Sequence, residues 1–151
     1  MYFNEQHPLN KKIVANKKVN GVVAISSPKD HPDPYMRSGS HPDVIERIWI
    51  VLGKTLPQDC SAMVYGSPAL VSPKSGVIIA QAYGTAYILR VPERRISEAK
   101  ELGYENSHFF SSSRNEVDLE KEFGSDWVFG KWNQIEQQWI LDVYNFLEQN
   151  I

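Results

Sequence analysis

The tripeptide His-Pro-Asp occurs twice in the chain, as His31-Pro32-Asp33 and as His41-Pro42-Asp43. Imidazole and carboxylate groups are metal ligands, so the two copies together could form a site with two histidines and two carboxylates. Ligand pairs ten residues apart do not match a usual ligand spacing, so the sequence does not favour a metal site. The second copy has a simpler interpretation, as the start of a helix.

Residues 40–43 have the composition of a helix N-terminus. Ser40 is the expected N-cap, Pro42 suits the first turn, and the Asp43 carboxylate is expected at N3, near the positive end of the helix dipole. Helical spacing continues to residue 56, because apolar residues recur at steps of three and four: Val44, Ile45, Ile48, Val51 and Leu52. The first His-Pro-Asp fits the same rule, but no helical pattern continues from it.

The chain contains no arrangement that is typical of an active site. Cys60 has no basic or histidine neighbour in sequence, and His108 lies beside two phenylalanines, where a structural role is more common. Residues 62–91 contain no Asp or Glu, so strands in this segment lack the carboxylates that acid–base catalysis uses. We therefore predict no catalytic, cofactor-binding or metal-ligating residues, and no cofactor.

Arginine and aromatic residues provide the main candidates for a binding surface. Arg90, Arg94 and Arg95 lie at a strand–helix junction, and arginine beside exposed aromatic rings can bind single-stranded nucleic acid. Acidic residues on the same helix neutralise them, and a net charge of −2 argues against a nucleic-acid partner. We expect a protein partner instead, at a surface that comprises His31, Tyr35, Arg37, Tyr65, Arg90, Arg94, Arg95, Trp127 and Trp132.

The elements that must position these residues follow from apolar periodicity and turn residues. Four strands joined by short turns predict an antiparallel meander, at residues 62–66, 68–73, 76–83 and 85–92. A helix is expected over residues 92–103, with Gly103 just past its end. Further along, we expect a short strand at 108–110, a helical turn within 116–123 and an extended segment at 126–132.

The last element is the clearest helix in the sequence. Asn133, followed three residues later by Glu136, forms the pattern of a capping box. The helix is expected to reach about Gln149, with one apolar face that comprises Ile135, Trp139, Val143, Phe146 and Leu147.

The order of these elements predicts an α+β fold, a small antiparallel sheet (a β-meander) with helices packed on one face. The predicted single α+β domain covers residues 41–151. Residues 1–40 are rich in Pro, Asn, Lys, Ser and Asp, and they are predicted to form a partly extended N-terminal arm with one short strand within residues 19–26.

Composition indicates the compartment. The chain has one cysteine, which cannot form an internal disulfide. Its first residues lack the apolar run of a secretory signal, and its longest apolar runs are too short to span a membrane. We expect a cytoplasmic protein without membrane association, and the sequence does not indicate its oligomeric state.

The central segment also carries a familiar order of motifs. A helix is followed by Met63-Val64-Tyr65-Gly66, a hairpin, a buried strand at 76–80, a strand at 85–91 and a helix at 94–103. In this order residues 41–104 resemble the N-terminal domain of TfoX-type competence regulators, in which the first strand ends in Met-Phe-Gly-Gly. Tyr65 and Ser67 depart from that motif, and the second, helical domain of the full-length regulators has no counterpart here. The resemblance implies an α+β domain that regulates through protein contacts, and it brings no catalytic residues.

Three functions remain open at this point. The first is a non-enzymatic interaction domain of the TfoX N-terminal type, acting through a protein partner. The second is an immunity or antitoxin protein that neutralises a cognate toxin, which the small size and mild acidity would suit. The third is an enzyme or small-molecule binder with a pocket at the sheet edge, near Tyr65, Tyr83 and Tyr87.

Overall fold

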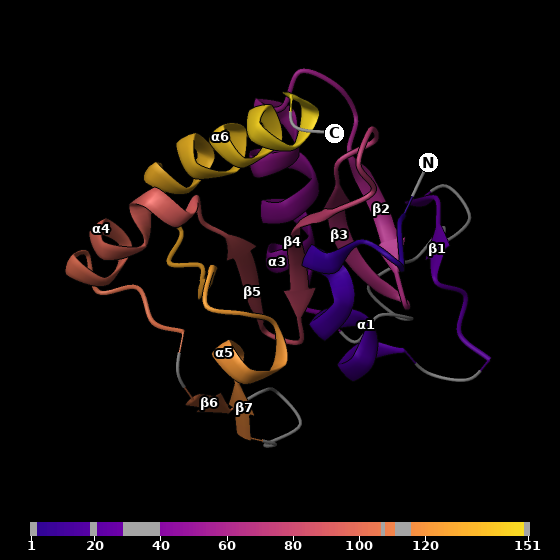
Figure 1. Cartoon of the computed structure of the whole chain (residues 1–151), viewed down its shortest axis with the longest axis horizontal. Helices are drawn as coiled ribbons and strands as arrows, with labels where there is room; N and C mark the ends of the chain where they lie inside the picture. Colours follow the sequence, from indigo (N-terminus) through magenta and orange to yellow (C-terminus); the bar gives the residue numbers. More distant parts are fainter. Residues whose placement is uncertain (1–2, 19–20, 29–39, 107, 111–115, 150–151) are drawn as a thin grey trace.

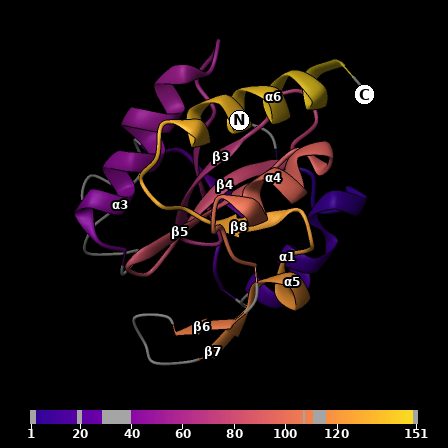
Figure 2. The ribbon, with the colours of Figure 1, turned by 90° about the vertical axis from the view of Figure 1, so that its left-hand side faces the viewer.

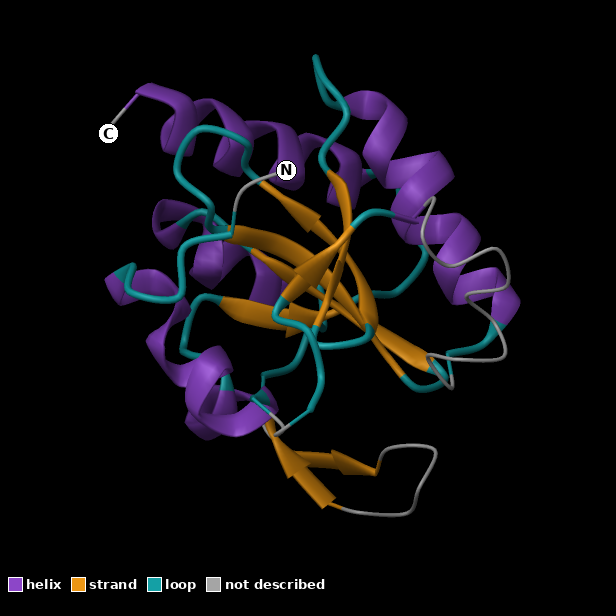
Figure 3. Ribbon diagram, turned by 90° about the vertical axis from the view of Figure 1, so that its right-hand side faces the viewer, coloured by secondary structure: helices purple, strands orange, loops and turns teal. Residues whose placement is uncertain are grey.

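A six-stranded antiparallel sheet forms the centre of the computed structural model, which describes residues 3–18, 21–28, 40–106, 108–110 and 116–149 (Figure 1). The strands follow the spatial order β1-β2-β3-β4-β5-β8. They comprise β1 (Ile25–Ser26), β2 (Ser61–Val64), β3 (Ser67–Val71), β4 (Ile78–Tyr83), β5 (Ala86–Arg90) and β8 (Trp127–Phe129). A separate hairpin pairs β6 (His108–Phe110) with β7 (Glu116–Asp118) and projects from the body of the molecule (Figure 3).

The meander predicted from residues 62–92 is confirmed, strand by strand. The β2–β3 hairpin pairs Val64 with Ser67 and turns through Tyr65 and Gly66, whose φ angles are 47° and 79°. Two consecutive positive φ angles characterise the type I′ turn, which matches the twist of a two-residue hairpin. Together with the helices packed on the sheet, the meander confirms the predicted α+β class and single domain.

Helices cover both faces of the sheet, so the expectation of one covered face is wrong. On one face lie α3 (Pro42–Glu46), η3 (Arg47–Leu52), α4 (Ile96–Glu101) and α6 (Ile135–Gln149). On the other lie α1 (Lys11–Lys17) and α5 (Leu119–Glu122), and Figure 2 shows α6 above the sheet and α1 and α5 below it. The physical reason is visible in β4, where Ile78 and Ile79 point to opposite faces and are both fully buried.

The helix expected from residue 43 forms, but its cap and its geometry differ from expectation. Its N-cap is His41, whose Nδ1 accepts the N–H of Asp43 at 3.1 Å. Pro42 occupies the first helical position, which requires an extended residue directly before it and so makes His41 the cap in place of Ser40. After α3 the helix widens into the π-helical η3 and ends in a 3₁₀ turn, η4 (Gly53–Thr55).

The N-terminal segment that was predicted as an arm contributes to the interior. It contains a short 3₁₀ helix, η1 (Pro8–Asn10), and then α1. The fully buried Asn10 amide donates to the carbonyls of Asn4 and Gly76 at 2.8 Å each and accepts the N–H of Ile78 at 3.1 Å. Ile13 is also fully buried. Residues 3–17 therefore pack across one face of the sheet.

The C-terminal elements confirm most of the predicted positions, but residues 116–118 form the strand β7 where a helical turn was expected, and only Leu119–Glu122 are helical. The extended segment forms β8, which pairs with β5, and the last helix, α6, begins at Ile135. Asn133 caps it, since its Oδ1 accepts the Ile135 N–H at 3.1 Å. Glu136 does not complete the capping box, because its carboxylate is fully buried under the helix.

Candidate functional site

Glu136 lies at the centre of a buried hydrogen-bond network. Its Oε2 accepts from Arg47 Nη2 at 3.1 Å and from the Tyr87 hydroxyl at 2.5 Å. Its Oε1 accepts from the Tyr104 hydroxyl at 3.0 Å and from the backbone N–H of Lys131 at 2.5 Å. The four donors come from η3, β5, the segment after α4 and the loop before α6, so the network joins four parts of the chain. We call these five residues the Glu136 network.

Burial makes this network a strong constraint. A buried carboxylate costs several kcal/mol unless it is paired and hydrogen-bonded, and here a guanidinium and three further donors meet it. Burial, together with the hydrogen bonds to Glu136 and its negative charge, raises the pKa of both Tyr87 and Tyr104 above the usual range. Both hydroxyls therefore remain protonated donors near neutral pH.

Trp132 is held directly by this network. The Tyr87 hydroxyl accepts the Trp132 backbone N–H at 2.7 Å, and the two rings meet edge to face with centroids 5.0 Å apart. The guanidinium carbon of Arg47 lies 5.8 Å from the centroid of the Trp132 ring. Even so, 51% of Trp132 remains exposed to solvent.

The backbone at Trp132 is strained. Its φ is 60°, in the left-handed region that residues other than glycine rarely adopt. Tyr65 also has a positive φ, but the type I′ turn requires it there. Trp132 does not lie in a hairpin turn. A positive φ at such a residue costs of the order of 1–3 kcal/mol, and it persists only when surrounding contacts enforce it. The Tyr87 hydroxyl supplies such a contact.

Gly130 lets the loop run this close to Tyr87. A Cβ atom at Gly130 would lie 1.8 Å from a ring carbon of Tyr87, a distance that no side chain tolerates. The Gly130 N–H donates to the Tyr87 carbonyl at 2.9 Å. The loop before α6 is therefore bonded to Tyr87 at two points, Gly130 and Trp132.

A small hollow of about 280 Å³ adjoins the exposed tryptophan. It is lined by Asp43, Glu46, Arg47, Val51 and Trp132. Ile50 follows on the next turn after Glu46, and 48% of it is exposed. We call these six residues the Trp132 face. It combines exposed apolar side chains with two carboxylates at its rim.

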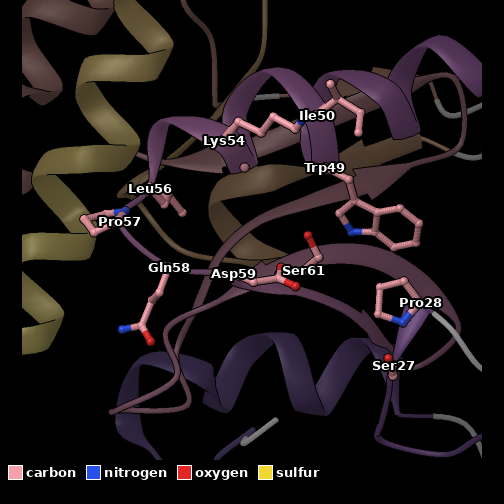
Figure 4. A pocket seen from close by; sticks show the side chains of 11 residues that line it. Ser27, Pro28, Trp49, Ile50, Lys54, Leu56, Pro57, Gln58, Asp59 and Ser61 are labelled. Atoms are coloured by element: carbon pink, nitrogen blue, oxygen red, sulfur yellow. The ribbon is translucent and has the colours of Figure 1, made fainter.

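A second hollow, of about 550 Å³, lies on the other side of η3 (Figure 4). Figure 4 shows Trp49 and Ile50 above it on the helix, with Ser27 and Pro28 at the opposite wall. The indole N–H of Trp49 donates to the Ala69 carbonyl at 3.1 Å, which ties this ring to the sheet. Ile50 lines this hollow and also extends the Trp132 face, so the π-helical segment presents side chains to both.

The predicted arginines lie beside a third hollow, an apolar groove of about 640 Å³ between the end of β5 and α6. Arg90 is buried beneath it and bonds to Ile78, Asp126 and Leu9, so its donors serve the fold. Arg94 and Arg95 share one oxygen of Asp142, at 3.4 and 3.3 Å. The groove walls comprise Leu9, Val91, Pro92, Val143, Phe146 and Leu147, with Glu93, Arg94, Asp126 and Asp142 among the polar lining.

The remaining predicted residues do not join these arginines in one surface. Trp127 is fully buried, with its ring centroid 4.7 Å from the Arg90 guanidinium carbon, so it is not a surface residue. Tyr65 is buried on the face of α1 and donates to Glu5 at 2.5 Å. Only Trp132 is both exposed and beside a hollow away from the arginines. His31, Tyr35 and Arg37 lie outside the described residues.

The three tyrosines of the expected sheet-edge pocket do not converge. Tyr65 and Tyr83 pack on the face that α1 covers, whereas Tyr87 packs on the opposite face, under α6. None of them lines the three hollows described above.

Sequence reasoning missed the Glu136 network. The spacing of Asn133 and Glu136 suggested a capping box, and nothing in the local sequence links Glu136 to Arg47 or Tyr104. The one usable signal was Trp132 in an aromatic-rich segment, which was included among the candidates.

Within the described part of the chain, no three His, Cys, Asp or Glu side chains are grouped so that they could hold a metal ion. No helix among the same residues is long and apolar enough to cross a membrane. No protein-family model, curated protein or solved structure matches the chain.

Proposed function

We propose that this protein is a non-catalytic interaction domain that binds a protein partner through the Trp132 face. One observation carries the proposal: a half-exposed tryptophan is held in a left-handed backbone conformation by a buried network. Strained residues that their surroundings enforce are concentrated at functional sites.

Rigidity is what makes this arrangement suitable for binding. Tryptophan is among the residues that contribute most to protein interfaces, particularly near their centres. A ring that is already fixed by Tyr87 and Arg47 loses little conformational freedom on association, which improves affinity. Val51 adds apolar area to the hollow beside the ring, and the exposed Ile50 precedes it on η3. Asp43 and Glu46 supply a polar rim, the usual surround of a binding surface.

The network itself favours positioning over chemistry. The Glu136 carboxylate is fully buried and its donors face it, so a substrate could not reach it without displacing Arg47 or a tyrosine. The resemblance to TfoX-type N-terminal domains implies the same class of function and stays a prediction. An immunity role, in which the partner is a toxin, would be one form of such binding and is also a prediction.

Site-specific photo-crosslinking in cells tests the proposal. A benzoylphenylalanine in place of Ile50 should give a discrete crosslinked band, and Trp132→Ala in the same chain should abolish it. The matched control carries the crosslinker at Val23, which is 68% exposed and lies outside the face. A band that survives Trp132→Ala, equal bands from both positions, or no band from Ile50 would each refute the proposal.

The apolar groove supports a second candidate function, binding of a small molecule. Its volume of about 640 Å³ falls within the range of ligand sites, and Phe146, 58% exposed, lies on its wall. Screening apolar fragments by two-dimensional NMR should shift the methyl signals of Val143 and Leu147. Phe146→Ser should weaken those shifts, whereas Val23→Ser should not. Methyl shifts confined to other regions would contradict this candidate.

A further inference from the structure

We propose that the Trp132 face accepts a lysine or arginine side chain of its partner, between the Trp132 ring and the carboxylates of Asp43 and Glu46. The inference rests on the proposed function and names the partner's chemistry at that surface.

Charge at the hollow is the first argument. Arg47 is the only cation among its lining residues, and its Nη2 lies 3.1 Å from Glu136, so its charge is already balanced. The Asp43 side chain is 78% exposed, and Glu46 is exposed as well. Among the residues that the structure describes, two carboxylates therefore stand around one small hollow without a balancing cation, which selects for positive charge.

His41 does not change this balance. Its Nδ1 lies 3.8 Å from Asp43 Oδ2, but the same nitrogen accepts the Asp43 backbone N–H. A nitrogen that accepts a hydrogen bond offers no N–H of its own, so His41 Nδ1 does not donate to the Asp43 carboxylate in this arrangement. Lys131, the next residue before Trp132, turns elsewhere: its Nζ lies 5.5 Å from the Tyr104 ring centroid.

The aromatic ring is the second argument. A tryptophan face attracts ammonium and guanidinium groups through its quadrupole, and Arg47 already packs on this ring at 5.8 Å. About half of the residue remains open to a further cation from outside. Carboxylates beside an exposed indole combine ion pairing with cation–π attraction in one site.

The size of the hollow and its apolar lining fit a long side chain better than a free inorganic ion. The hollow of about 280 Å³ is large enough for roughly one long side chain. Lysine and arginine carry long aliphatic stems that pack on apolar surface while the charged end stays near polar groups. Val51 lines the hollow, so its apolar side chain can contact such a stem.

Defined peptides provide the test. Acetyl-Gly-Lys-Gly-amide is titrated into the ¹⁵N-labelled protein, and the indole N–H signal of Trp132, assigned with Trp132→Phe, is followed. We expect saturable shifts of that signal, and at least about fivefold weaker binding of the same peptide with an acetylated lysine. Asp43→Asn with Glu46→Gln should weaken binding of the lysine peptide by about fivefold.

The matched control neutralises two exposed carboxylates elsewhere, Glu98→Gln with Glu101→Gln on α4, and should leave the affinity unchanged. Equal binding of both peptides, no shift of the Trp132 signal, or an affinity insensitive to Asp43→Asn with Glu46→Gln would overturn the inference.

The crosslinking experiment separates this inference from the proposed function. If the Ile50 crosslink persists in Asp43→Asn with Glu46→Gln but is lost in Trp132→Ala, the face binds a partner without using its carboxylates, and only the inference fails. If no crosslink forms while the lysine peptide binds as expected, the proposed function fails and the cation preference of the hollow stands.

Discussion

The Tyr87 hydroxyl accepts the backbone N–H of Trp132 at 2.7 Å while it donates to Glu136. One buried hydroxyl thus connects an exposed aromatic residue with the centre of the interior network. We therefore expect that the conformation of Trp132 at the surface depends on Tyr87, a buried residue that a partner would not contact.

Tyr87→Phe removes both hydrogen bonds at once. Loss of a donor to the buried carboxylate and of an acceptor for Trp132 should lower the free energy of unfolding by about 2–3 kcal/mol, measured by urea denaturation. The indole signal of Trp132 should also move, because its backbone loses the contact that enforces φ.

Tyr104→Phe is the control for that variant. Its hydroxyl donates to Glu136 at 3.0 Å, whereas the Trp132 backbone N–H donates to Tyr87 and not to Tyr104. We expect a comparable cost of about 1–3 kcal/mol with the Trp132 signal and the Ile50 crosslink unchanged. Equal effects of both variants on Trp132 would show that Tyr87 has no special role in holding it.

Glu136→Gln leaves Arg47 buried without its anion. Removal of one partner of a buried ion pair costs about 3–5 kcal/mol, because the other charge remains uncompensated. Combining it with Arg47→Met should cost clearly less than the sum of the single variants. The exposed Glu98→Gln serves as the control, with a change within about 0.5 kcal/mol. Strict additivity of the pair would show that the two charges are not coupled.

Lys17 predicts a pH dependence of stability. Burial lowers the pKa of its ammonium group to about 8, opposed by the charge of Glu122, while its Nζ lies 3.5 Å from the Tyr83 ring centroid. Between about pH 8 and 10 the unfolded chain binds more protons at this residue than the folded chain, so its contribution to stability rises with pH. The cation–π contact favours the charged form and reduces the effect.

The measurement compares the wild type with Lys17→Met by chemical denaturation at pH 7.5 and 9.5. We expect the wild type to gain about 1 kcal/mol relative to the variant over this interval. The comparison is necessary because Cys60 acts in the opposite direction. Burial raises the pKa of its thiol to about 12, so its contribution to the stability of the protein falls as pH rises in the same interval. That loss is common to both chains. Parallel pH profiles would contradict the prediction for Lys17.

Asn10→Ala tests how firmly the N-terminal segment is joined to the sheet. Its amide makes two donor contacts and one acceptor contact in the interior, so we expect a cost of about 2–4 kcal/mol, measured by urea denaturation, and faster proteolysis near α1. Asn16→Ala, on the exposed side of α1, should cost less than about 1 kcal/mol. Similar results for both variants would indicate a loosely attached segment.

Local patterns predicted the parts of the fold that local forces form. The apolar runs and turn residues within 62–92 predicted the meander, and the apolar spacing after Asn133 predicted α6. The sequence also named Trp132 and Arg94 as candidate surface residues, and in the structure each borders a hollow. The amphipathic pattern after Pro42 predicted a helix, but not its π-helical widening, which the local spacing of apolar residues does not reveal.

Only the tertiary structure decided what Asn10, Arg47 and Glu136 do. By sequence, Asn10 belonged to an arm and Glu136 to a capping box, since each had a plausible local role. In the fold they also bond to partners 32 to 89 residues away along the chain, Asn10 to Gly76 and Glu136 to Tyr104 and Arg47. A buried polar group is satisfied by whichever donors the packing brings to it, and no local periodicity encodes them. Local sequence patterns therefore determined the meander and α6, and packing determined the network that holds Trp132 at the surface.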